Sequence, residues 1–83
     1  MEREQILKLL AEFLNNATMG RASDVSPDDH LQDTVGLDSM GAVEFVSQIE
    51  EEFEFDEVSA EEIAKMKTLN DAADFVEARL SAS

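Results

Sequence analysis

One serine in this sequence stands where it could carry covalent chemistry. Ser39 lies in the stretch Gly36-Leu37-Asp38-Ser39-Met40, at the expected start of an acidic amphipathic helix and after a long connection. The N-terminus of a helix presents unpaired backbone N–H groups and the positive end of the helix dipole, so a phosphodiester on this serine would be stabilised there. Alternatively, Asp38 or Ser39 only caps the helix, and the pair Asp-Ser does not by itself separate the two interpretations.

The rest of the sequence offers little for catalysis or for metal binding. The only histidine, His30, lies in an acidic segment with no serine or cysteine at a motif position near it. Neither a phosphate-binding glycine loop nor a dinucleotide fingerprint occurs, and the absence of cysteine excludes the common zinc patterns. The stretch from Asp24 to Asp33 lacks the glycine and the spacing of a calcium loop. We therefore expect no catalytic residue and no dedicated metal site.

The elements that must position Ser39 are predicted to be helices. A chain of 83 residues suffices for one domain, 1–83, with a modest core. Hydrophobic periodicity and capping motifs predict helices over residues 4–17, 38–53, 59–66 and 68–80. The expected fold is an all-α, small four-helix bundle with three main helices and a short third helix, and a long loop follows the first helix.

Within that loop the stretch Ser26-Pro27-Asp28-Asp29 predicts a short helical turn. We expect Leu31, Val35 and Leu37 to hold the loop against the core. In the helix over 38–53 the expected inward residues are Ala42, Phe45, Val46, Ile49 and Phe53, and the expected outward residues are Glu44, Gln48, Glu51 and Glu52.

The net charge of −14 is concentrated in the middle of the chain. Fourteen of the 20 acidic residues lie between Arg21 and Lys65, a window that contains no lysine or arginine. Such a surface would repel nucleic acid and attract a partner with a basic patch. No apolar run is long enough to span a membrane, and the N-terminus does not have the layout of a secretory signal. We expect a soluble, cytoplasmic monomer that binds neither nucleic acid nor membrane.

The residues from Gly36 to Phe53 resemble the acyl carrier protein family. They match its Gly-x-Asp-Ser-Leu motif and the helix that follows, which ends in Glu-Glu-Glu-Phe. The first helix, the loop and the Lys65–Leu69 entry to the last helix fall in the family's order, so the resemblance covers nearly the whole chain. Met40 replaces the usual leucine and Gly41 a common acid, which suggests a specialised carrier.

The resemblance implies that Ser39 carries 4′-phosphopantetheine, which a separate phosphopantetheinyl transferase donates from coenzyme A. The arm's thiol would hold acyl groups as thioesters and present them to enzymes of fatty acid or related lipid or polyketide synthesis. The carrier itself would catalyse nothing. The implied docking residues, which would meet basic patches on the acyl-loading and acyl-processing enzymes, are Asp38, Met40, Val43, Glu44, Glu50 and Glu51. The acyl pocket that the resemblance implies consists of Ala42, Phe45, Ile49 and Phe75.

Two other functions remain open from the sequence. The run Asp-Ser-Met-Gly also resembles stand-alone aminoacyl carriers, including the D-alanyl carrier of cell-wall modification. A third possibility, from a different class, is an acidic helical adaptor without an arm. Loading with an amino acid rather than a fatty acid would indicate an aminoacyl carrier, and a functionally silent Ser39→Ala would indicate the adaptor without an arm.

Overall fold

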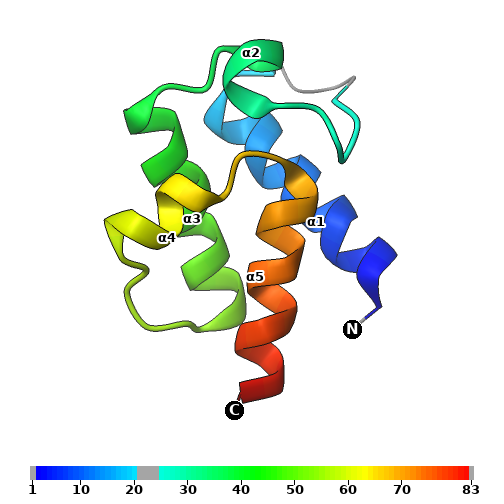
Figure 1. The fold of residues 1–83 in the computed structure, drawn as a ribbon, viewed down its shortest axis with the longest axis vertical. Helices are drawn as coiled ribbons and strands as arrows, with labels where there is room; N and C mark the ends of the chain where they lie inside the picture. The colour runs from blue at the N-terminus through cyan, green and yellow to red at the C-terminus, as the bar shows by residue number, and fades with distance from the viewer. Residues whose placement is uncertain (1, 21–24, 83) are drawn as a thin grey trace.

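A computed structural model of the chain describes residues 2–20 and 25–82 and shows a bundle of helices (Figure 1). Within those ranges there is no β-strand, which confirms the all-α prediction. The three main helices and the short α4 lie where the sequence placed them, and a fifth, five-residue helix lies inside the long connection. The elements in order are α1 Arg3–Ala17, α2 Leu31–Val35, α3 Ser39–Phe53, α4 Ala60–Lys65 and α5 Leu69–Ala82.

The core forms where α1 packs against both α3 and α5. Helix α1 contributes Ile6, Leu10 and Leu14, which are spaced four residues apart and are fully buried. Helix α3 contributes Phe45, Val46 and Ile49, and α5 contributes Ala72, Ala73 and Val76. Ala42 and Phe53, expected to face inward as well, are only partly buried.

The long connection contains a turn followed by a helix. At Ser26–Asp29, where a helical turn was predicted, the Asp29 N–H donates to the Ser26 carbonyl (3.0 Å) and the Ser26 N–H donates to the Asp29 carboxylate (2.9 Å). An acid that accepts from the backbone N–H three residues earlier is one half of a capping box, so the predicted turn forms, and α2 follows from Leu31. Leu31 and Val35 are buried and Leu37 is partly buried, so these residues do hold the connection against the core.

Both predicted start signals on the C-terminal side form the expected hydrogen bonds. The Ser59 hydroxyl accepts from the Glu62 N–H (3.2 Å) at the start of α4. At α5 the Asp71 N–H donates to the Thr68 hydroxyl (3.1 Å), and the Thr68 N–H donates to the Asp71 carboxylate (3.2 Å). Helix α5 continues to Ala82, two residues beyond its expected end.

Gln48 differs from its expected outward position. Its side chain is half-buried between α3 and α1 and donates a hydrogen bond to the Phe13 carbonyl (3.1 Å). An amide can satisfy the backbone of a neighbouring helix, which a periodicity argument cannot foresee. None of the helices in the described ranges has both the length and the apolarity needed to cross a membrane.

Candidate functional site

Ser39 is the first residue of α3, and Asp38 caps that helix. The Asp38 carboxylate accepts a hydrogen bond from the Gly41 N–H (2.8 Å), and the Asp38 carbonyl accepts from the Ala42 N–H (2.9 Å). Of the two residues that could have capped the helix, Asp38 therefore does so, and the hydroxyl-bearing side chain of Ser39 lies exposed beside it. The serine is thus accessible to a modifying enzyme, on a helix turn that its neighbour fixes.

Two glycines shape the approach to Ser39. Gly36 ends α2 with φ +65°, a left-handed conformation that glycine adopts at no steric cost. At Gly41 an added Cβ would lie 2.9 Å from Leu37 Cδ1 and 3.2 Å from Asp38 Oδ1. The glycine that departs from the family pattern therefore leaves space for the Leu37 side chain and for the capping carboxylate.

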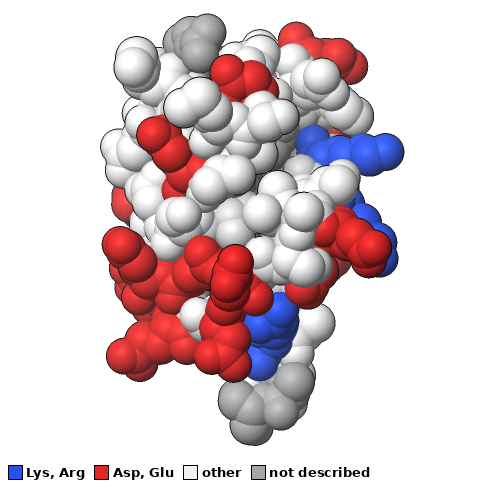
Figure 2. All heavy atoms as spheres, turned by 90° about the vertical axis from the view of Figure 1, so that its left-hand side faces the viewer, with Lys and Arg blue, Asp and Glu red and all other residues white. Residues whose placement is uncertain are grey.

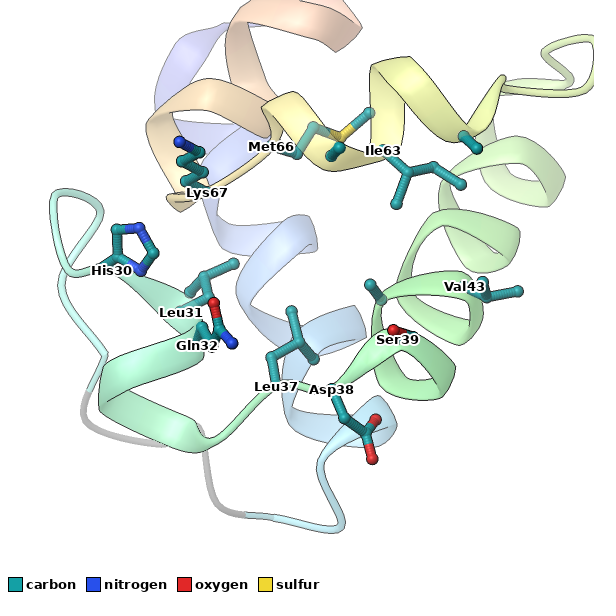
Figure 3. A pocket seen from close by; sticks show the side chains of 13 residues that line it. His30, Leu31, Gln32, Leu37, Asp38, Ser39, Val43, Ile63, Met66 and Lys67 are labelled. Atoms are coloured by element: carbon teal, nitrogen blue, oxygen red, sulfur yellow. The ribbon is translucent and has the colours of Figure 1, made fainter.

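A groove of about 570 Å³ opens beside Ser39, between the first turn of α3, helix α4 and the α2 segment (Figure 3). This volume is in the range of small-molecule sites, about 300–1,000 Å³. Its lining residues are His30, Leu31, Gln32, Leu37, Asp38, Ser39, Ala42, Val43, Ala60, Ile63, Ala64, Met66 and Lys67.

The four residues of the implied acyl pocket do not line a common cavity in the structure, although Phe75 packs against the core that contains Phe45 and Ile49. Of these four residues only Ala42 lines the groove beside Ser39. Phe45 and Ile49 are buried in the core between α3 and α1, and Phe75 lines a separate hollow with Glu62 and Asp71. Helical periodicity placed the α3 pair on the inward face correctly, but it does not distinguish packed core from a lined cavity.

The groove residues that sequence reasoning missed come from α4 and the α2 segment. Ile63 and Met66 are three residues apart, the spacing of one helix face, and Leu37 is two residues before Ser39. These local patterns could have indicated an apolar wall near the serine. The polar lining residues His30, Gln32 and Lys67 give no such pattern, because they meet only in the folded chain.

The surface around Ser39 is apolar near the serine and acidic farther along α3. Met40 and Val43 are 76% and 54% exposed. Acidic side chains gather over the lower part of the face on which α3 and α4 lie (Figure 2). The exposed acids of the later part of α3 and the segment after it are Glu51, Glu52, Glu54, Asp56 and Glu57.

The four acids expected on the docking surface differ in their surroundings. Asp38, Glu44 and Glu51 are exposed. Glu50 is half-buried, and its carboxylate accepts a hydrogen bond from the Val58 N–H (2.8 Å). Glu50 therefore braces the segment between α3 and α4, and less of its charge faces a partner.

Helix α4, one wall of the groove, is tied to α5 by a single arginine. The Arg79 guanidinium donates to both carboxylate oxygens of Glu62 (3.3 and 3.2 Å). The same guanidinium lies over the rings of Phe75 and Phe55, 4.9 and 5.9 Å from their centroids. Hydrogen bonds from Arg79, and then from the Ser59 backbone, hold the pKa of Glu62 below its ordinary value of 4.5.

This lowered pKa makes the attachment of α4 sensitive to acid. A carboxyl group with a lowered pKa contributes stability above its unfolded-state pKa of 4.5, and that contribution is lost as the pH falls through the folded-state value. We expect Glu62→Gln to melt below the wild type at about pH 7, with the difference shrinking as the pH falls below 4.5.

The measurement is the thermal midpoint of both proteins by circular dichroism over that pH range. Glu61→Gln is the matched control, because Glu61 is exposed in the same first turn of α4 and has no arginine partner among the described residues. A gap between Glu62→Gln and the wild type that persists unchanged at the acid end would contradict the assignment.

No cluster of three or more potential metal ligands occurs among residues 2–20 and 25–82. Asp24, the first residue of the calcium-loop candidate, lies outside those ranges.

Comparison with known proteins gives consistent similarities. The family model described as "Phosphopantetheine attachment site" matches residues 4–76. An acyl carrier protein of Acidothermus cellulolyticus is 34% identical over 76 residues, covering 92% of this chain and 89% of that protein. One from Micrococcus luteus is 32% identical, covering 90% and 91%. The solved acyl carrier protein from Enterococcus faecalis superposes with a TM-score of 0.70 at 32% identity and covers 92% of this chain and 95% of that one.

Proposed function

Because this chain belongs to the acyl carrier protein family, we propose that Ser39 is the residue to which its phosphopantetheine arm is attached. Members of this family carry reaction intermediates and do not catalyse. In the attachment step the Ser39 oxygen forms a bond to the phosphorus that bears pantetheine in coenzyme A. The pyrophosphate bond breaks, the adenine nucleotide leaves, and the hydroxyl proton passes to a base of the transferase.

The observation that carries this proposal is the exposure of Ser39 beside its own groove. The serine is accessible, Asp38 supplies the helix cap in its place, and the attached phosphate would lie at the N-terminus of a 15-residue helix. Backbone N–H groups and the helix dipole favour negative charge at that position. The arm therefore needs no rearrangement of the fold to be accepted.

The experiment that tests attachment is intact-mass measurement after incubation with coenzyme A, Mg²⁺ and a broad-specificity phosphopantetheinyl transferase. We expect the protein to gain the mass of one phosphopantetheine. No gain from a protein with a normal helical spectrum would overturn the proposal and leave the acidic-adaptor alternative.

The groove beside Ser39 is the site that we propose for the acyl group. Its walls include Leu31, Leu37, Ala42, Ile63 and Met66, whose apolar side chains would cover a hydrocarbon chain and remove it from water. The cargo would then be that of fatty acid synthesis or of related lipid or polyketide synthesis. An amino acid as cargo is the alternative, and loading by an adenylating enzyme with an amino acid would indicate it.

The partners that we propose are the transferase and acyl-loading and acyl-processing enzymes with basic docking patches. Their contact would combine the exposed apolar residues Met40 and Val43 with the exposed acids Asp38, Glu44 and Glu51. Exposed charges of this kind act mainly on the rate of association, through long-range attraction. We further propose that the chain is a monomeric, single-domain carrier of the cytoplasm.

Reversing the charge of Glu44 is expected to weaken this docking. We expect Glu44→Lys to lower kcat/KM of the transferase by about tenfold at low ionic strength, and the loss should shrink as salt screens the charges. Glu44 is chosen over Asp38 because Asp38 also caps α3, so its substitution would change the fold locally.

Glu12→Lys is the matched control, since Glu12 is an exposed acid on α1 and changes the net charge equally. If both variants lost the same activity, overall charge and not the α3 surface would be responsible.

A further inference from the structure

The groove beside Ser39 is apolar along its length but polar at one end. In Figure 3 Ser39 and Val43 lie at one side of the groove, and His30, Gln32 and Lys67 lie at the opposite side. Leu31 lies beside Gln32, and Leu37 lies between these residues and Ser39. A backbone hydrogen bond from the Leu31 N–H to the Lys67 carbonyl (2.9 Å) joins the α2 segment to the start of α5, so the three polar residues line the same groove.

Each of the three polar residues carries an N–H donor. Lys67 has an ammonium group, Gln32 a carboxamide and His30 an imidazole, and all three residues are exposed at the rim. His30 Nδ1 lies 3.8 Å from the carboxylate of Asp33. For the Lys67 and Gln32 side chains, no hydrogen bond or ion pair to another residue occurs in the described part of the chain.

Lys67 also stands out against the charge of its surroundings. It is the only lysine or arginine among the residues that line the groove, in a chain with a net charge of −14. The nearest acid along α5, Asp71, uses its carboxylate to accept from the Lys67 and Thr68 backbone N–H groups (3.1 and 3.2 Å). Lys65, two residues earlier, lines the separate hollow with Phe75.

We propose that this end of the groove recognises a hydrogen-bond-accepting oxygen on the acyl group, at a distance from the thioester. The proposal rests on the proposed function and narrows its cargo to oxygen-bearing acyl groups, with a carboxylate bound more strongly than a ketone. An oxygen that enters an apolar groove loses its hydrogen bonds to water, and only donors such as these replace them. A hydrogen bond from an ammonium group to a carboxylate is charge-assisted and is the strongest that the three donors can form.

The test compares acyl groups of equal length that differ only in oxygen content. The transferase attaches acyl-phosphopantetheine directly from the acyl-coenzyme A, and intact mass verifies loading. The cargoes are a straight medium-length acyl chain that ends in a methyl group, the same chain that ends in a carboxylate, and the same chain with a ketone near its far end. Each is measured in the wild type, Lys67→Gln and the control Lys65→Gln, which removes the same charge outside the groove.

The readouts are the thermal midpoint and the amide chemical shifts of Leu31, Gln32 and Lys67. We expect Lys67→Gln to lower the midpoint of the carboxylate-loaded protein by about 4 °C, the size expected for one such hydrogen bond in a domain of this length. Lys67→Gln should lower the midpoint of the ketone-loaded protein by less. Its effect on the midpoint of the methyl-loaded protein should equal its effect on the midpoint of the unloaded protein. Lys65→Gln should change the thermal midpoint by the same amount with all three cargoes.

Three results would overturn the inference. Equal effects of Lys67→Gln on carboxylate and methyl cargo would show that the polar end does not contact the cargo. Equal effects of Lys67→Gln and Lys65→Gln would assign the preference to general electrostatics. In both cases loading at the serine would still be intact, so the proposed function would stand. No mass gain with any cargo would overturn both together.

Discussion

We expect Ser39→Ala to fold as the wild type does and to gain no phosphopantetheine. The substitution removes the only oxygen that the proposed attachment can use and takes nothing from the helix cap, which the Asp38 carboxylate makes with the Gly41 N–H. Alanine is also a favourable residue inside a helix. The measurement is intact mass after the transferase reaction, with the far-ultraviolet circular dichroism spectrum and thermal midpoint recorded on the same sample.

Ser47→Ala supplies the matched control. Ser47 is an exposed serine two turns farther along the same helix, so the substitution removes an equivalent hydroxyl from α3. We expect it to be modified as fully as the wild type. Modification of Ser39→Ala, or its loss in Ser47→Ala, would place the arm on another residue.

Phe45→Ala is expected to cause the largest loss of stability. Phe45 is 2% exposed and is the largest of the fully buried side chains, at the contact of α3 with the rest of the core. Truncation of a buried phenylalanine costs about 3–5 kcal/mol, through lost burial and the cavity left behind. Domains of this size are stable by roughly 4–12 kcal/mol, so the variant should lose a large part of its free energy of unfolding.

The measurement is urea denaturation followed by circular dichroism, with Val43→Ala as the control. Val43 lies on the same helix but is 54% exposed, so its truncation should change the free energy of unfolding by less than about 1 kcal/mol. A small loss in Phe45→Ala, close to that of Val43→Ala, would mean that Phe45 lines open space and does not pack in the core. Phe45 would then belong to the acyl pocket that the family resemblance implied.

Local sequence chemistry predicted the helices because each start signal acts over a few residues. The Ser59–Glu62 capping box and the Thr68–Asp71 pair are complete within one helical turn, and the structure forms both. At Ser26–Asp29 the same local reasoning predicted a helical turn, and the structure forms it, with the Ser26 N–H donating to the Asp29 carboxylate.

The groove could not be predicted in the same way, because its walls come from three separate segments. His30 and Lys67 are brought to one end by a backbone hydrogen bond between segments far apart in the chain. Glu50 gives a similar lesson: the family resemblance implied a docking role for it, but the path of the segment after α3 brings the Val58 N–H to its carboxylate. Such contacts depend on tertiary structure and leave no periodic pattern in the sequence.

Helix α4 is held to the rest of the fold by fewer buried residues than α3. With six residues, α4 buries none of them fully, and the ion pair of Glu62 with Arg79 ties it to α5. The opposite wall belongs to α3, which is fixed in the core by Phe45, Val46 and Ile49. The α4 wall of the groove is therefore held less firmly than the α3 wall. Under the proposed function, we expect longer acyl groups to be admitted by displacement of α4, while the α3 surface proposed for docking stays unchanged.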